Sequence, residues 1–192
     1  MLGLLLLGMP VCALAARPWP DTRERIVPYA DQLPGDLTAA QRRFAATHLA
    51  GTQKMRRSEI RALRAYNPNF LCLHYQLAVG AGPAEFILGD AWGSDWAQVN
   101  AQEGWFFHNA AGQRIHQAQW NWDVMDIRYE GGRPVTGFPD YWMRTCLERI
   151  RAAESDGVFA DSYLPDAYGF GQSRPAHPWL EDPALCMARW VP

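Results

Sequence analysis

The sequence lacks the features that would assign it to several common functional classes. Its 18 Lys and Arg are balanced by 20 Asp and Glu, the formal net charge is -2, and the basic residues form no block. Without a basic patch, charge-driven binding to nucleic acid or to an anionic membrane surface is excluded. The chain has no Gly-x-Ser-x-Gly motif of a serine hydrolase. The glycine-rich stretch near Gly171 lacks the Lys-Ser/Thr ending of a phosphate-binding loop.

Cysteine is scarce, and no pair has the Cys-x-x-Cys spacing of a metal site. Cys12 belongs to an N-terminal apolar run, and the three cysteines that remain permit at most one intramolecular disulfide. Cys72 lies in an apolar stretch and Cys146 in a helical pattern, so both are predicted to be small buried hydrophobic residues, while Cys186 is left over. We predict no metal and no cofactor, because three histidines also match no short metal motif: His48, His74 and His108.

Only one long apolar run is present, and it lies at the N-terminus. It extends from Leu2 to a small-x-small pattern at Ala13-Leu14-Ala15, which is typical of a signal-peptide cleavage site. The run is too short to span a bilayer as a stable helix. We therefore predict that residues 1–16 are a signal peptide and that the mature protein is secreted or periplasmic, without stable membrane insertion.

The rest of the chain has the length and the 48% hydrophobic content of one globular domain. Residues 17–40 contain four prolines and no apolar period, which predicts an extended lead-in rather than a strand or helix. We expect the domain to cover residues 41–192. Its first strand is predicted over residues 44–50, and a helix over residues 58–66 follows, with Ser58 as its N-cap.

Residues 70–77 give the clearest strand pattern in the chain. Apolar side chains occur on both faces, and polar ones only near the carboxyl end, as in parallel sheets covered by helices. Residues 80–119 then form a long aromatic-rich loop, with a hairpin predicted around a turn at Ala111-Gly112. Loops of this length inside a compact domain usually carry function.

Two further predicted strands end in carboxylates. Residues 122–127 form the third, with Asp126 near its end, and a buried-looking fourth strand over residues 157–161 ends at Asp161. An amphipathic helix over residues 140–154 lies between them. Parallel strands carry their chemistry at their carboxyl ends and lie ~4.8 Å apart, so the two carboxylates are expected side by side. Alternatively, Asp161 caps the next loop and Asp126 is a turn or helix-entry residue.

The order of these motifs resembles the (β/α)8 glycoside hydrolases, and most of all the hypothetical glycoside-hydrolase-like families known mainly from genome sequences. The resemblance covers roughly residues 41–163. It implies an α/β fold: a partial TIM-type barrel, its front half only, with parallel strands in about four β/α units. The motifs that carry it are Thr47-His48, Asn67-Pro68-Asn69-Phe70-Leu71, His74-Tyr75-Gln76, Asn100-Ala101-Gln102-Glu103, Trp105-Phe106-Phe107-His108, Met125-Asp126-Ile127, Tyr141-Trp142 and Asp156-Gly157-Val158-Phe159-Ala160-Asp161-Ser162.

The resemblance also implies an activity, the hydrolysis of O-glycosyl bonds in an extracellular or periplasmic oligo- or polysaccharide. Asp161 is then the nucleophile or charge stabiliser, because an oxocarbenium-like transition state needs a carboxylate beside the anomeric carbon. Asp126 is its partner carboxylate or a ligand of sugar hydroxyls. Structural roles stay open for the residues expected to bind the sugar, which are His74, Gln76, Glu103, Trp105, His108, Trp120, Trp122 and Tyr163.

The chain departs from this family in length. A complete barrel takes about 250 residues, and the acid/base residue expected after the sixth strand is absent. We expect a truncated front half; a half barrel completed by a second copy, as a homodimer, and a degenerate protein that binds without hydrolysing are the alternatives. Whether this chain is an enzyme therefore stays open. Two other functions remain, noncatalytic carbohydrate binding and a metal-dependent deacetylation that a chelator would abolish.

Overall fold

The computed structural model describes residues 17–83, 95–118 and 121–161. These residues form a mixed α/β structure with a four-stranded parallel sheet and four α-helices, which confirms the predicted α/β class. Two small antiparallel sheets accompany it. In the part of the chain that is described, no helix has both the length and the apolar character needed to cross a membrane.

The parallel sheet is built in chain order. Its strands follow one another as β1-β2-β3-β9, and every neighbouring pair is parallel. Helix α1 connects β1 to β2, α2 connects β2 to β3, and α4 leads into β9. The bounds are β1 Tyr29–Gln32, α1 Ala39–His48, β2 Gly51–Gln53, α2 Arg57–Arg64, β3 Leu71–Leu77, α4 Phe138–Ala153 and β9 Gly157–Asp161.

One face of this sheet carries the helices. The core on that face joins Phe70 and Cys72 to apolar side chains from three helices, namely Ala45 and Ala46 of α1, Ile60 and Leu63 of α2, and Ala153 of α4. Because side chains alternate along a strand, Leu71, Leu73 and Tyr75 lie on the opposite face. Cys72 is buried and free, and so is Cys146 on α4, which confirms the prediction for both. Cys186 lies outside the described residues.

The predicted first strand, residues 44–50, is wrong, because most of this run is the end of α1. The helix starts earlier at a capping box, in which the Gln41 backbone N–H donates to Thr38 Oγ1 and the Thr38 backbone N–H donates to Gln41 Oε1. The strand begins instead at Gly51, where an added Cβ would lie 2.4 Å from the Leu71 carbonyl oxygen. The lead-in also contains a strand, β1, which pairs with β2 through backbone hydrogen bonds that composition does not reveal.

The predicted third strand belongs to another sheet. Only residues Trp122–Val124 form a strand, β6, and it pairs antiparallel with β4 (Gly80–Ala81) and β5 (His116–Gln117) in the order β4-β6-β5. The neighbour of β9 is β3. The expectation that Asp126 and Asp161 end adjacent strands is therefore wrong. Alternation of apolar and polar residues predicts a strand, but it does not identify the strand with which it pairs.

The predicted hairpin in the aromatic-rich loop is confirmed. The Asn109 N–H donates to the Gln113 carbonyl at 2.8 Å, and the Ile115 N–H donates to the Phe107 carbonyl at 2.9 Å. Gly112 closes the turn with φ of +74°, a conformation that glycine adopts without steric cost. The same loop contains α3 (Trp96–Asn100) and a 3-10 helix (Glu103–Trp105). The antiparallel pair β7 (Tyr129–Glu130) and β8 (Arg133–Pro134) follows β6 in the chain.

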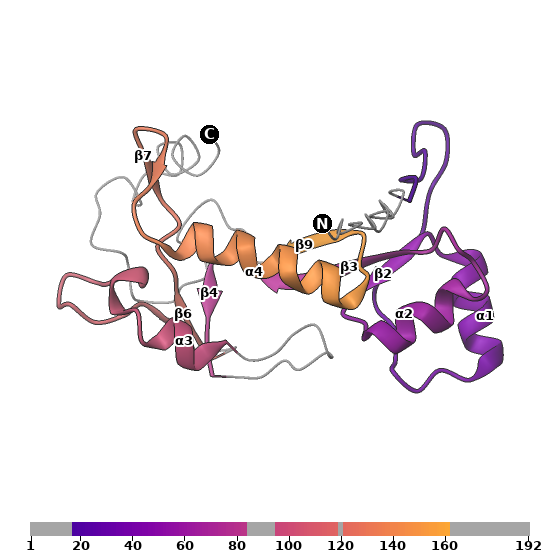
Figure 1. Ribbon diagram of the computed structural model, residues 1–192, viewed down its shortest axis with the longest axis horizontal. Helices are drawn as coiled ribbons and strands as arrows, with labels where there is room; N and C mark the ends of the chain where they lie inside the picture. Colours follow the sequence, from indigo (N-terminus) through magenta and orange to yellow (C-terminus); the bar gives the residue numbers. More distant parts are fainter. Residues whose placement is uncertain (1–16, 84–94, 119–120, 162–192) are drawn as a thin grey trace, which may run out of the picture.

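Helix α4 confirms the predicted amphipathic helix. It connects the parallel sheet to the region that contains α3 and β6 (Figure 1). Its first turns place Phe138 and Tyr141 in an aromatic core with Val99 of α3, while Ala153 at its other end packs under the parallel sheet. Leu147 on the same helix is 47% exposed. The predicted N-cap Ser58 is also wrong, since α2 begins at Arg57.

Candidate functional site

Asp161 ends β9 at the carboxyl edge of the parallel sheet. Its backbone pairs with Leu77 of β3, and its carbonyl oxygen accepts a 2.9 Å hydrogen bond from the Ala78 N–H. Its carboxylate accepts a hydrogen bond from the Tyr75 hydroxyl group. The strand is less buried than predicted, because Phe159 is 37% exposed and stacks on the Tyr75 ring at 6.3 Å between centroids. An acidic group and two aromatic rings therefore lie together at this edge.

A lysine extends this arrangement toward β2. Lys54 directly follows β2 and has φ of +61°, the left-handed region that non-glycine residues rarely adopt. Its Nζ atom lies 4.5 Å from the centroid of the Tyr75 ring and 3.3 Å from Asp31 Oδ2 on β1. Four side chains, one from each strand or its end, thus form a series across the sheet that we call the edge row: Asp31, Lys54, Tyr75 and Asp161.

Gln53 is a buried neighbour of the edge row and contacts Asp31. It is 1% exposed, and its Nε2 group donates to Asp31 Oδ1. Its Oε1 atom has no hydrogen-bond partner among the described residues. A buried acceptor without a partner costs about 1–3 kcal/mol, and such costs concentrate at functional sites.

The electrostatics of the edge row keep the Tyr75 hydroxyl protonated. Burial raises the pKa of Tyr75 well above its ordinary value of 10, and the hydrogen bond to Asp161 and the Asp161 charge raise it further. Tyr75 is therefore a hydrogen-bond donor over the physiological pH range. Counting formal charges, the two Asp and one Lys give the row one net negative charge. Such a site can stabilise positive charge that develops on a bound molecule.

His74 and Gln76 lie on the helix-covered face of β3, opposite to Tyr75. The Gln76 Oε1 atom accepts a 2.6 Å hydrogen bond from Arg149 of α4 and lies 3.3 Å from His74 Nε2. His74 is 5% exposed, and burial lowers its pKa to about 4. The structure thus places these two predicted sugar ligands under α4, on the other face of the sheet from Asp161.

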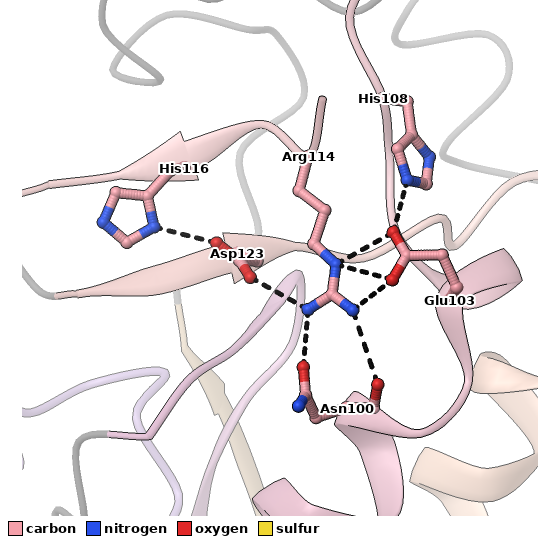
Figure 2. Close-up of polar contacts among 6 residues, drawn as sticks. All are labelled: Asn100, Glu103, His108, Arg114, His116 and Asp123. Carbon is pink, nitrogen blue, oxygen red and sulfur yellow. Dashed lines mark hydrogen bonds and ion pairs between the residues drawn. The ribbon is translucent and has the colours of Figure 1, made fainter. Parts of the chain in front are cut away.

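Glu103 and His108 lie together in the hairpin region, in a cluster centred on Arg114 (Figure 2). His108 Nε2 lies 2.7 Å from Glu103 Oε1, and Arg114 Nε donates to both Glu103 oxygens at 3.0 and 3.1 Å. These hydrogen bonds lower the pKa of Glu103 to about 2, and those from Arg114 have the larger effect. Three further residues complete the cluster, which are Asn100, Asp123 and His116.

Two of the predicted sugar-stacking tryptophans are packed against the protein itself. Trp122 is 7% exposed, and a Cβ added at Gly80 would meet its ring at 2.2 Å. Trp105 packs against Phe138 and Tyr141, with ring centroids 6.1 and 5.2 Å apart. The other predicted aromatic contacts, Trp120 and Tyr163, lie outside the described residues.

Asp126 is buried in the loop after β6, with 5% exposure. Its two carboxylate oxygens accept hydrogen bonds of 2.8 and 2.7 Å from Arg128 Nε and Nη2. Its backbone N–H donates to the Trp105 carbonyl at 2.7 Å. The structure therefore assigns this carboxylate a buried ion pair in the region of the second sheet.

Sequence reasoning missed three residues of the edge row: Asp31, Lys54 and Tyr75. Placing the first strand at residues 44–50 hid Lys54, which a strand at 51–53 would have put at its carboxyl end. The alternation along β3 could have identified Tyr75, which carries a hydroxyl group two residues before the strand ends, on the same face as Leu77. Among the described residues, no group of three or more His, Cys, Asp or Glu side chains could hold a metal ion.

The comparisons with known proteins bear on this site. The family model described as hypothetical glycosyl hydrolase family 15 matches residues 64–192, more than half of the chain. The matched region contains Tyr75 and Asp161, while Asp31 and Lys54 precede it. No curated protein matches the chain.

Proposed function

Because the chain belongs to the hypothetical glycosyl hydrolase family 15, we propose that it acts as a glycoside hydrolase at the carboxyl edge of its parallel sheet. Asp161 is the carboxylate placed beside the anomeric carbon. It acts as nucleophile or as stabiliser of the oxocarbenium-like transition state. The observation that carries this proposal is the position of Asp161 at the end of β9, within the matched residues.

The topology supports the finer proposal that the sheet is part of a TIM-type barrel. In such a barrel each β/α unit adds the next strand on the same side, and all helices cover the outer face. A doubly wound sheet instead reverses its strand order at a switch point. The order β1-β2-β3-β9 has no reversal, and α1, α2 and α4 contribute to one core on one face. We further propose that the domain begins with β1.

The strand spacing decides against Asp31 as the group that protonates the leaving oxygen. Asp31 and Asp161 lie on β1 and β9, which are separated by three inter-strand steps. At ~4.8 Å a step this is roughly 14 Å along the sheet, whereas the paired carboxyl groups of glycosidases lie about 5–9.5 Å apart. Asp31 is therefore assigned to holding Lys54, with which it forms an ion pair.

The apolar run of residues 2–15 supports the accompanying proposal that the substrate is an extracellular or periplasmic oligo- or polysaccharide. Flat aromatic rings bind the faces of sugars. Phe159, 37% exposed beside Asp161, is the residue we assign to that contact.

The test is turnover of a panel of aryl glycosides and oligosaccharides by the purified chain and by Asp161→Asn. The substitution keeps the shape of the side chain and removes its charge, so we expect kcat to fall by about three orders of magnitude or more. Asp140→Asn is the matched control, because Asp140 is an exposed carboxylate in the first turn of α4, and we expect it to leave kcat unchanged. Unchanged turnover in Asp161→Asn would refute the assignment.

The same experiment distinguishes noncatalytic carbohydrate binding. The exposed Phe159 ring favours this second function, since it would bind a sugar with or without catalysis. Binding alone predicts no turnover by the unmodified chain and equal sugar affinity in Asp161→Asn, measured by calorimetry. It also predicts that Phe159→Ala loses that affinity.

A further inference from the structure

We propose that Tyr75 is a positioning residue for Asp161, and that Lys54, anchored by Asp31, holds the Tyr75 ring in the place where its hydroxyl group can do this. The inference rests on the proposed function, because it assigns to Asp161 the role of the working carboxylate. It adds three residues to the site, Tyr75, Lys54 and Asp31, to which neither the family match nor the sequence motifs give a role.

The first step is the hydrogen bond from the Tyr75 hydroxyl to Asp161 Oδ2. Both residues lie on the same face of the sheet, because parallel strands in register point equivalent side chains to the same side, and Tyr75 pairs with Phe159 two residues before Asp161. A hydrogen bond to the charged form of a carboxyl group favours that form. The hydroxyl group thus fixes the direction of one carboxylate oxygen of Asp161.

The second step is the environment of the Tyr75 ring. Phe159 stacks on it with an interplanar angle of 15°, and the Lys54 ammonium lies 4.5 Å from its centroid. A cation over an aromatic face is attracted by the negative charge density of the ring. The ring is therefore held by contacts from β9 and from the end of β2.

The third step is the anchoring of Lys54. Its side chain is 17% exposed, and its ammonium pairs with Asp31, whose other carboxylate oxygen accepts a hydrogen bond from the buried Gln53. The backbone of Lys54 adopts the left-handed conformation, which persists in a non-glycine residue only where the surroundings hold it. This geometry brings the ammonium over Tyr75.

The structure describes charged groups on both faces of the sheet near the end of β9. On the face of Asp161 they are Lys54 and Asp31, with Tyr75 as the titratable neighbour. On the opposite face, His74 and Arg149 lie between β3 and α4. Tyr75→Phe therefore removes a hydrogen bond that the Asp161 carboxylate accepts, and the Lys54 variants change the contact that holds the Tyr75 ring.

The decisive variant is Tyr75→Phe, which keeps the ring against Lys54 and Phe159 and removes only the hydroxyl group. We expect the acid limb of the kcat/KM pH profile to rise by ~1 pH unit, and kcat to fall about tenfold with KM changed less than threefold. Tyr129→Phe, at a tyrosine 39% exposed on β7, is the control and should match the unmodified protein. An unshifted acid limb in Tyr75→Phe would overturn the proposal.

A readout without substrate separates this proposal from the proposed function. Carboxyl-carbon NMR of aspartate-labelled protein, with the Asp161 signal assigned by its loss in Asp161→Asn, reports the titration of Asp161 directly. We expect its midpoint to rise by ~1 pH unit in Tyr75→Phe, whether or not the chain turns over any glycan. If no glycan is hydrolysed but the midpoint rises, the proposed function fails and the positioning by Tyr75 stands.

Lys54→Met and Lys54→Arg test the second half of the proposal. Methionine keeps the length of the side chain and removes the charge, so the Asp161 midpoint should rise by a fraction of a pH unit, and arginine should restore it. An Asp161 midpoint in Lys54→Met equal to that of the unmodified protein would overturn the role of Lys54. Circular dichroism at each pH confirms that the variants are folded.

Discussion

Asp156 holds the turn that carries the chain from α4 into β9, and its loss should be among the more damaging single changes. Its Oδ2 atom accepts hydrogen bonds of 2.6 Å from Arg64 Nη2 and 2.8 Å from the Cys72 N–H. Its Oδ1 atom accepts a 2.8 Å hydrogen bond from Arg17 Nη1. Asp156 therefore joins α2, β3 and the residues before β1 to the start of the strand that ends at Asp161.

The substitution Asp156→Asn removes the charge and keeps the shape. The side chains of Asp156 and Arg64 are 8% and 9% exposed, so the change leaves a guanidinium buried without its counter-ion. Breaking a buried pair in this way costs about 3–5 kcal/mol. Arg64 keeps its hydrogen bonds to the Glu154 and Phe70 carbonyls, so we expect a loss of stability at the lower end of this range. A loss of about 3 kcal/mol corresponds to a Tm lower by roughly 6–12 °C.

The assay is urea unfolding followed by tryptophan fluorescence, with a thermal melt beside it. Asp21→Asn is the matched control. Asp21 forms a bidentate ion pair with Arg23, but the Asp21 and Arg23 side chains are 53% and 86% exposed. Exposed pairs contribute little, so the control should unfold at the same urea concentration as the unmodified protein. A change of less than about 0.5 kcal/mol in Asp156→Asn would refute the reasoning, since that is the range of ordinary surface substitutions.

Two further predictions concern burial. Because burial lowers the pKa of His74 from 6.5 to about 4, the unfolded chain binds a proton more readily. The stability linked to this is complete above pH 6.5 and is lost as the pH falls toward 4, by about 3 kcal/mol. Urea unfolding at several pH values should show a flatter dependence in His74→Gln, but not in His48→Gln at an exposed site; equal slopes in both would contradict the assignment. Gly80→Ala places a Cβ 2.2 Å from the Trp122 ring and should lower stability by about 1–3 kcal/mol, whereas Gly104→Ala, with nothing within 4 Å, should not. Equal Tm values for the two alanine variants would contradict this prediction, because they would show that the Trp122 ring moves aside without loss of stability.

Local patterns allowed several elements to be predicted from the sequence. Apolar residues on both faces of β3, the three- and four-residue spacings in α4, and the Ala111-Gly112 turn each depend on contacts within a few residues of the chain. These patterns also placed Asp161 at the end of a strand. The apolar run before Gly51 was misread because a capping box and a short strand with buried polar residues carry weaker signals.

The grouping of the site residues could not be predicted in this way. Asp126 and Asp161 both follow strand-like patterns, yet β6 pairs antiparallel with β4 and β5, while β9 pairs with β3. Glu103 and His108 lie together beside Arg114, a partner that the sequence did not indicate for either residue. In each case the choice of partner depends on backbone hydrogen bonds and ion pairs between segments far apart in the chain.

The sequence by itself determined the α/β class, the strand that ends in Asp161 and the family resemblance, because these follow from periodicity and from the order of short motifs. Only the tertiary structure decided that Asp31, Lys54 and Tyr75 accompany Asp161. Strand order and the left-handed backbone of Lys54 bring these four side chains together from positions up to 130 residues apart, counting from Asp31 to Asp161. No local pattern records such a contact, since its free energy comes from pairing and packing that exist only after the chain has folded.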